Sequence, residues 1–385
     1  MRAGGGPRTR RLLLAVMSAV VAVSVFVVAL RFTSRDAEST AAPPPNADRS
    51  AVTSSELSTP PPTSTSAAPP ASSVPSTSEL RFEEWVDDVA DWLDIPRRAM
   101  YAYATATVTL GDEQPDCHLS WVTLAGVGRT TTDHGRVNDG TVSEDGTMSE
   151  PIDTVEVRDF AGDLVSAPGA AGPLQLSPEV WESFQASPTG GTPDIQNIDD
   201  AALTAGRAMC ADGRDLSDGD GWLDGVSVLQ DEPLFLHRVL ATANIYGTVG
   251  ESRSKPNTAA LQAVMFAVDK IGLPYVWGGN GEEAGHDGFD CSGLTTAAYG
   301  SAGISLMRTA HTQYHSVPLV PADEELQLGD LVFFGDPATK IHHVGIYIGN
   351  RQMIDAPTFG QAVQVHNYRK PGDNYAGAGR PTAEQ

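Results

Sequence analysis

The 385-residue sequence is poor in cysteine and in basic residues, and each shortage limits the classes of function that the protein can have. Lys plus Arg number 25 against 49 Asp plus Glu, and the net charge of −24 argues against a nucleic-acid partner. Most acids fall in residues 81–250, where their spacing is not that of a calcium loop and favours a solvated surface over a metal site. The three cysteines are Cys117, Cys210 and Cys291. An odd number outside the cytoplasm suggests one disulfide pair and one thiol kept free.

Long apolar runs are also few, and the clearest one lies near the N-terminus. Residues 1–11 carry four arginines and no acid, and residues 12–30 are apolar or small throughout. Such a run just spans a bilayer as a helix, and its positive flank stays in the cytoplasm. We therefore expect a cytoplasmic tail (1–11) and a single-pass anchor (12–30) in the cell membrane, with the remaining chain outside. A cleaved signal peptide is the alternative, although the end of the run is a poor cleavage site.

Residues 31–79 contain almost nothing from which to build a core. Ser, Thr, Pro and Ala fill 33 of the 40 positions from 39 to 78, which is typical of a disordered linker. Helical spacing begins at Leu80, with apolar residues three and four apart at Phe82, Trp85, Val86, Val89, Trp92 and Leu93. A polar stretch at 250–256 separates this block from a second one. We predict two folded domains, 80–250 and 251–385.

The second block places a cysteine where a nucleophile is expected. Residues 258–271 have the apolar spacing of an amphipathic helix. After a glycine-rich loop, Asp290 is a typical cap for a helix whose first turn holds Cys291. At that place the helix dipole and free N–H groups stabilise a thiolate and can hold an oxyanion. Cys291 is therefore the candidate nucleophile.

A base for this thiol is found in the strand pattern around His343. Alternation sends Val344, Ile346 and Ile348 to one face of the strand and His343 to the other. Asp355, in the next expected strand, can orient the imidazole only if it shares that face. A two-residue turn would place it on the wrong side, so the hypothesis requires a three-residue loop or a bulge between the strands.

Four motifs in a fixed order resemble the NlpC/p60 papain-like cysteine peptidases of bacterial cell walls: Tyr275-Val-Trp-Gly-Gly, Asp290-Cys-Ser-Gly-Leu, Gly329-Asp-Leu-Val-Phe-Phe and His343-Val-Gly-Ile-Tyr-Ile-Gly. The resemblance covers about residues 257–380 and implies an α+β fold with an antiparallel sheet packed on the cysteine helix. It implies that Cys291 is the nucleophile, His343 the base and Asp355 the third polar residue, a position often held by histidine. It assigns Tyr275, Ser292 and Arg308 to substrate binding and requires no metal or other cofactor.

The first block resembles the actinobacterial lytic transglycosylases of the lysozyme-like superfamily across about residues 82–248. The resemblance implies a mostly helical, glycan-binding domain with a disulfide between Cys117 and Cys210. Thr131 stands where that family has its catalytic glutamate. A hydroxyl cannot protonate a glycosidic oxygen at neutral pH, so we expect no glycan cleavage. The domain would then hold glycan or serve only as a scaffold.

Together these observations predict a membrane-anchored peptidoglycan hydrolase. Its cysteine endopeptidase would cut stem peptides of the cell wall, by resemblance at the bond between D-glutamate and the diamino acid. An amidase or transpeptidase using the same thiol is one alternative. A non-catalytic wall-binding or assembly protein of secretion or conjugation machinery is another, because wall hydrolases of this layout occur in conjugative elements.

Overall fold

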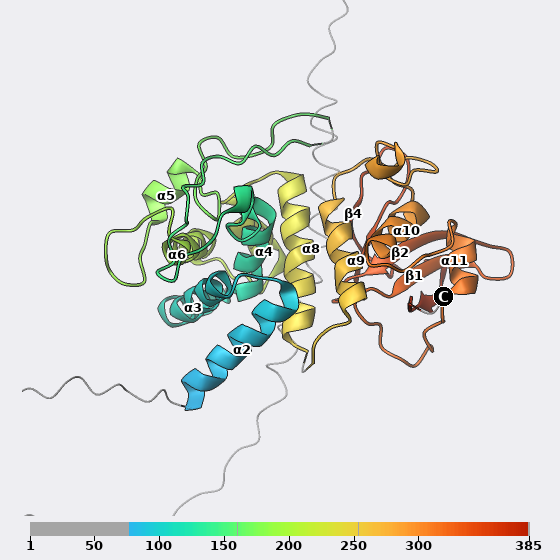
Figure 1. Cartoon of the computed structure of the whole chain (residues 1–385), viewed down its shortest axis with the longest axis horizontal. Helices are drawn as coiled ribbons and strands as arrows, with labels where there is room; N and C mark the ends of the chain where they lie inside the picture. Colours follow the sequence, from blue (N-terminus) through green and yellow to red (C-terminus); the bar gives the residue numbers. More distant parts are fainter. Residues whose placement is uncertain (1–76, 160, 253, 384–385) are drawn as a thin grey trace, which may run out of the picture.

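The computed structural model describes residues 77–159, 161–252 and 254–383. The predicted tail, anchor and linker lie outside these ranges, apart from the last residues of the linker. Within the described ranges, no helix is long and apolar enough to cross a membrane. Figure 1 shows a helical region and a region built on a β-sheet, with helices α8 and α9 lying between them.

The first region is made of helices joined by irregular segments. The α-helices are α2 (Thr77–Leu93), α3 (Arg97–Glu113), α4 (Trp121–Thr132), α5 (Pro178–Phe184), α6 (Ile198–Met209), α7 (Gly219–Ser227) and α8 (Pro233–Gly250). Short 3₁₀ helices lie at η1 (Pro115–Cys117), η2 (Val137–Asp139) and η3 (Ala211–Gly213). The predicted helical spacing after Leu80 is confirmed by α2, in which Val86 and Val89 are buried.

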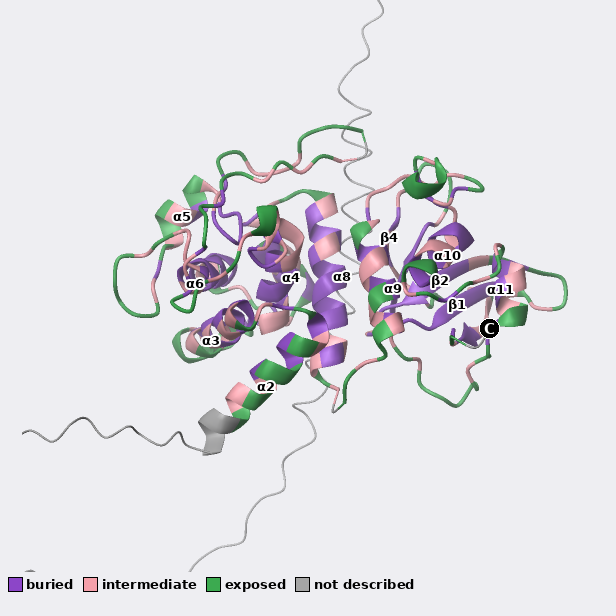
Figure 2. Ribbon diagram, viewed as in Figure 1, coloured by how far each residue is buried: buried purple, intermediate pink, exposed green. Residues whose placement is uncertain are grey.

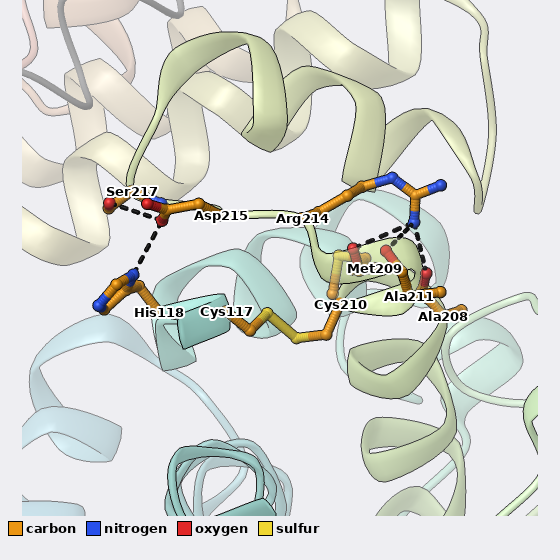
Figure 3. The surroundings of a disulfide bond; sticks show 9 residues. All are labelled: Cys117, His118, Ala208, Met209, Cys210, Ala211, Arg214, Asp215 and Ser217. Atoms are coloured by element: carbon orange, nitrogen blue, oxygen red, sulfur yellow. Dashed lines mark hydrogen bonds and ion pairs between the residues drawn. A yellow bond between two sulfur atoms is a disulfide. The ribbon is translucent and has the colours of Figure 1, made fainter. Parts of the chain in front are cut away.

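A disulfide joins two of these helical segments. Cys117 and Cys210 are bonded across 93 residues of sequence, which confirms the predicted pair. The surroundings are polar: the side chain of Arg214 donates hydrogen bonds to the carbonyl of Ala208 in the last turn of α6 and to that of Ala211 just after it, and His118 contacts Asp215 at 2.8 Å (Figure 3). The bridge therefore closes a long loop through the centre of the helical region.

The second region is an antiparallel sheet with helices packed against it. Its five strands run in the order β4-β3-β2-β1-β5. They are β1 (Leu331–Asp336), β2 (Lys340–Tyr347), β3 (Gln352–Asp355), β4 (Gln364–Asn367) and β5 (Tyr375–Gly379). The helices are α9 (Thr258–Asp269), η4 (Glu282–Ala284), α10 (Cys291–Ser301) and α11 (Ala310–Ser316). The predicted order, a mostly helical region followed by an α+β region, is confirmed.

The connection between β2 and β3 has the length that the sequence argument requires. Ile346 pairs with Ile354 and Tyr347 with Met353, and the Ile348 N–H donates to the carbonyl of Gln352. Three residues, Gly349, Asn350 and Arg351, form the loop, and all three have a positive φ. This register sets Asp355 opposite Gly345, on the same face of the sheet as His343.

The two regions share one apolar core. Figure 2 shows buried residues running from the helical region through α8 and α9 into the sheet. Most of α8 is buried, and its Asn244 amide donates to the carbonyl of Gly349 at 3.1 Å and to Gln352 Oε1 at 3.2 Å. Arg129 on α4 forms an ion pair with Asp269 on α9 at 3.0 Å. The second region is therefore packed against α8 over part of its β3–β4 edge.

Candidate active site

Cys291 begins helix α10 and is partly buried. Asp290 caps the helix, since its carboxylate accepts a hydrogen bond from the Gly293 N–H at 2.6 Å. The segment fits tightly, because a Cβ added at Gly293 would overlap the carbonyl oxygen of Gly279. The predicted position of this thiol, in the first turn of a helix, is thus confirmed. Its sulfur lies in the positive field of the helix N-terminus.

Arg308 holds the start of the cysteine helix from outside. Its guanidinium binds both carboxylate oxygens of Asp290, each at 2.9 Å, and contacts Ser292 Oγ at 3.0 Å. Ser292 is buried. The contacts described for these two side chains are all internal to the protein, so their predicted role in substrate binding stays a prediction, while their structural role is plain.

His343 lies between the thiol and a buried carboxylate. Its Nε2 is 2.6 Å from Asp355 Oδ2, and its ring lies close enough to the side chain of Cys291 for that thiol to raise its pKa. Because Nε2 faces the carboxylate, Nδ1 is the nitrogen left for the sulfur. Burial disfavours the charged imidazole, but the hydrogen bonds and charges of Asp355 and Cys291 prevail and raise the pKa of His343 to about 10. The site therefore favours an imidazolium beside the thiol.

Asp355 has a second partner, which the sequence argument missed. Its other oxygen, Oδ1, is 2.7 Å from Nδ1 of His366 on β4. Burial would raise the pKa of this carboxyl, but the charges and hydrogen bonds of both histidines hold it well below its usual range. The carboxylate thus stays ionised. The sequence carried no signal for His366, since its contact depends on the β3–β4 register.

Aromatic side chains gather beside the thiol. Burial raises the pKa of Tyr275, and the charges of Cys291 and Asp290 add to the effect. Tyr275 meets Phe359 edge-to-face at 5.1 Å between ring centroids, and Phe359 stacks on Trp277 at 6.4 Å. Trp277 is 73% exposed and Phe359 68% exposed. They form an apolar surface open to solvent next to the predicted nucleophile.

Thr131, at the predicted position of the missing acid, lies in the last turn of α4. Its hydroxyl is 2.9 Å from the carbonyl oxygen of Val127 and 3.2 Å from that of Pro173. A cavity beside it, lined in part by Val155, Gln175 and Arg238, has a volume of about 20 Å³. That is room for about one water molecule and too little for a sugar ring.

A larger groove, of about 1370 Å³, lies between the two regions and is lined from α8 and from Tyr347, Tyr368 and Tyr375. None of Cys291, His343 and Asp355 lines it. Among the described residues, no three His, Cys, Asp or Glu side chains gather in a way that could bind a metal ion.

A thiol at a helix start, beside an imidazole that a carboxylate orients, is the arrangement of a cysteine peptidase. Comparison with known proteins agrees: residues 272–377 match the NlpC/P60 family. Peptidoglycan endopeptidase RipB of Mycobacterium tuberculosis is 32% identical over 219 residues, which cover 53% of this chain and 86% of the relative. The chain belongs to the NlpC/P60 family.

Two further relatives match over shorter stretches. The probable endopeptidase p60 of Listeria seeligeri is 50% identical over 86 residues, 22% of this chain and 15% of that protein. The gamma-D-glutamyl-L-lysine dipeptidyl-peptidase of Bacillus cereus is 41% identical over 114 residues, 29% of this chain and 33% of that protein. The family match lies wholly in the second region. The resemblance of the helical region to lytic transglycosylases stays a prediction.

Proposed function

We propose that this protein is a peptidoglycan hydrolase whose second region is a cysteine endopeptidase acting on stem peptides of the cell wall. The observation that carries the proposal is the series of three side chains in which Cys291 begins α10, His343 lies beside it, and Asp355 is hydrogen-bonded to His343. The family adds support, since RipB, by its name, is a peptidoglycan endopeptidase. Tyr275, with Trp277 and Phe359 beside it, supplies apolar surface for the peptide.

The mechanism follows from the positions of these groups. The Cys291 thiolate attacks the scissile carbonyl carbon, and backbone N–H groups near the helix start stabilise the oxyanion. The His343 imidazolium gives its proton to the leaving amine, which departs as the C–N bond breaks. His343, now neutral, takes a proton from water, and the resulting hydroxide attacks the thioester. The C–S bond breaks, the acid product leaves, and the Cys291 thiolate and the His343 imidazolium are regenerated. Asp355 stabilises the imidazolium in both steps.

For the bond, we propose the link between D-glutamate and the diamino acid. The B. cereus relative supports this choice, because its name states that it acts at a gamma-D-glutamyl-L-lysine bond. An amidase or a transpeptidase would use the same thiol on another bond or another acceptor. The mass of each product separates these reactions.

The test is incubation of the purified full-length protein with muropeptides of defined sequence, followed by mass spectrometry. We expect fragments cut after D-glutamate from the wild type and none from Cys291→Ala. A protein that binds insoluble wall but releases no peptide would support the non-catalytic alternative and overturn the proposal. Equal product from Cys291→Ala would overturn the assignment of the nucleophile.

For the helical region we propose a scaffold without transglycosylase activity. The contacts of Thr131 with backbone carbonyls and the small cavity beside it support this. Anhydro-sugar ends released from glycan strands by Cys291→Ala would contradict it. The membrane anchor at 12–30 and export of the remaining chain are also proposals, tested by membrane fractionation and by protease accessibility on intact cells.

A further inference from the structure

The carboxylate of Asp355 is clamped between two imidazole rings. Oδ2 faces Nε2 of His343 at 2.6 Å, and Oδ1 faces Nδ1 of His366 at 2.7 Å. An ionised carboxylate only accepts hydrogen bonds, so both ring nitrogens carry a proton. Asp355 is 2% exposed, and water does not replace either donor. Each carboxylate oxygen therefore has one imidazole donor.

His366 reaches Asp355 diagonally across the sheet. In the β3–β4 register His366 is opposite Met353, and Gln364 is opposite Asp355. Helix α8 of the helical region contacts β4, and on this helix His237 is buried, with no hydrogen-bond partner for its Nδ1 among the described residues. Burial, together with the charge of His366, lowers the pKa of His237 to about 4, so this ring is neutral at neutral pH. His366 is thus in direct contact with Asp355, and it lies close enough to His237 for their charges to interact.

We propose that His366 is a positioning residue for the cysteine site: its Nδ1–H fixes the Asp355 carboxylate so that Oδ2 lies along the Nε2–H of His343. The final torsion of an aspartate side chain is broad, and one hydrogen bond alone leaves the carboxylate free to rotate about it. A second donor on the other oxygen removes that freedom. The imidazole of His343 is then held with its other nitrogen toward the sulfur of Cys291.

This inference rests on the proposed function for its kinetic test, and a matched set of variants separates positioning from packing. His366→Val introduces a β-branched side chain, which suits a strand, and removes the donor. His366→Asn restores an amide N–H close to the place of Nδ1–H. Gln364→Val is the control, because Gln364 lies on the same strand and its amide contacts Gln361, not Asp355. Circular dichroism and thermal unfolding confirm that each variant folds.

For His366→Val we expect kcat on the muropeptide to fall about 10-fold with little change in KM, since a misoriented base costs rate rather than binding. The basic limb of the pH profile should move to lower pH, because a loosely held Asp355 stabilises the His343 imidazolium less. His366→Asn should restore kcat to within about 2-fold of wild type and return the basic limb to its wild-type position. Gln364→Val should leave the pH profile unchanged.

A second readout does not depend on the substrate. Cys291 is the one cysteine outside the disulfide among the three in the sequence, so alkylation by iodoacetamide reports its thiolate. In His366→Val the rise of the alkylation rate with pH should move to higher pH, opposite to the basic limb of the kinetic profile, because a less stable imidazolium stabilises the thiolate less. His366→Asn should restore the wild-type curve. A folded His366→Val with the wild-type pH profile, or a His366→Asn no better than His366→Val, would overturn the proposal. An inactive wild type whose alkylation profile shifts as described would overturn only the proposed function.

Discussion

Replacing Asp355 with asparagine tests the electrostatics of the site, because it keeps the shape of the side chain and removes its charge. The hydrogen bonds and charges of Asp355 and Cys291 raise the pKa of His343 from 6.5 to about 10 against the effect of burial. This difference corresponds to roughly 5 kcal/mol of stabilisation of the imidazolium, at about 1.4 kcal/mol per pKa unit. Asparagine cannot accept hydrogen bonds from two N–H groups on both of its terminal atoms, so one of the two contacts is also lost.

The expected loss of activity grows with pH. If the pKa of His343 returns to about 6.5, roughly a tenth of the imidazole stays protonated at pH 7.5 and about a hundredth at pH 8.5. We therefore expect kcat/KM of Asp355→Asn to fall about 10-fold at pH 7.5 and about 100-fold at pH 8.5, with a smaller loss at pH 5.5. Wild type should keep its activity to higher pH, because its imidazolium persists until the pH approaches the raised pKa.

The assay is kcat/KM for muropeptide cleavage between pH 5 and 9, with iodoacetamide alkylation of Cys291 as a second measure. Asp330→Asn is the matched control. Asp330 is 1% exposed and pairs with Arg380, so its replacement also disturbs a buried ion pair, but one with no described contact to Cys291 or His343. A loss in Asp355→Asn that is the same at every pH would refute the reasoning, as would an equal shift of the pH profile in Asp330→Asn.

Three further results are expected. Removal of the disulfide in the double variant Cys117→Ala, Cys210→Ala should lower the free energy of unfolding by about 4–5 kcal/mol, measured in urea, from the entropy of a loop of 93 residues; an unchanged urea midpoint would contradict this. Gly293→Ala should abolish both alkylation of Cys291 and muropeptide cleavage in a folded protein, because the added Cβ would overlap the Gly279 carbonyl. Gly300→Ala is the control on the same helix and should retain activity, because nothing lies within 4 Å of its added Cβ. Burial lowers the pKa of His134 to about 3, so the stability that its neutral ring contributes is present above pH 6.5 and declines as the pH falls toward 3. The free energy of unfolding in urea should therefore be lower by roughly 2–3 kcal/mol at pH 4.5 than at pH 7. If His134→Gln lost the same amount between these pH values, His134 would not be the cause.

The positions of Cys291 and His343, the proposed nucleophile and base, could be predicted from the sequence because both depend on local patterns. A capping residue before Cys291 and strict alternation around His343 fix where each side chain points within its own element. The length of the β2–β3 loop could only be stated as a condition. Three successive residues with positive φ make that loop, and two of them, Asn350 and Arg351, are not glycines. Such backbone leaves a weak trace in a sequence.

The contacts that support the catalytic groups were beyond sequence reasoning. Arg308 is predicted to meet substrate, yet it binds the carboxylate of the residue that caps the cysteine helix. His366 lies on a strand whose register with β3 no hairpin turn fixes, because the intervening loop contains Phe359 and runs for eight residues between Asp355 and Gln364. Contacts across such a loop are set by tertiary packing and not by local propensity.

That packing gives the helical region a part in the peptidase site. The Asn244 amide on α8 donates to the carbonyl of Gly349, the first residue of the β2–β3 loop, and Thr248 on the same helix lies so close that a Cβ at Gly349 would overlap it. The length of this loop determines the register of β3, and the register determines that Asp355 shares a face with His343. On the same helix, His237 lies close enough to His366 for their charges to interact, and His366 is the second donor to that carboxylate. One helix of the first region therefore contacts both the loop that sets the position of Asp355 and the strand that holds its orientation. The helical region can in this way be required for the activity of the second region.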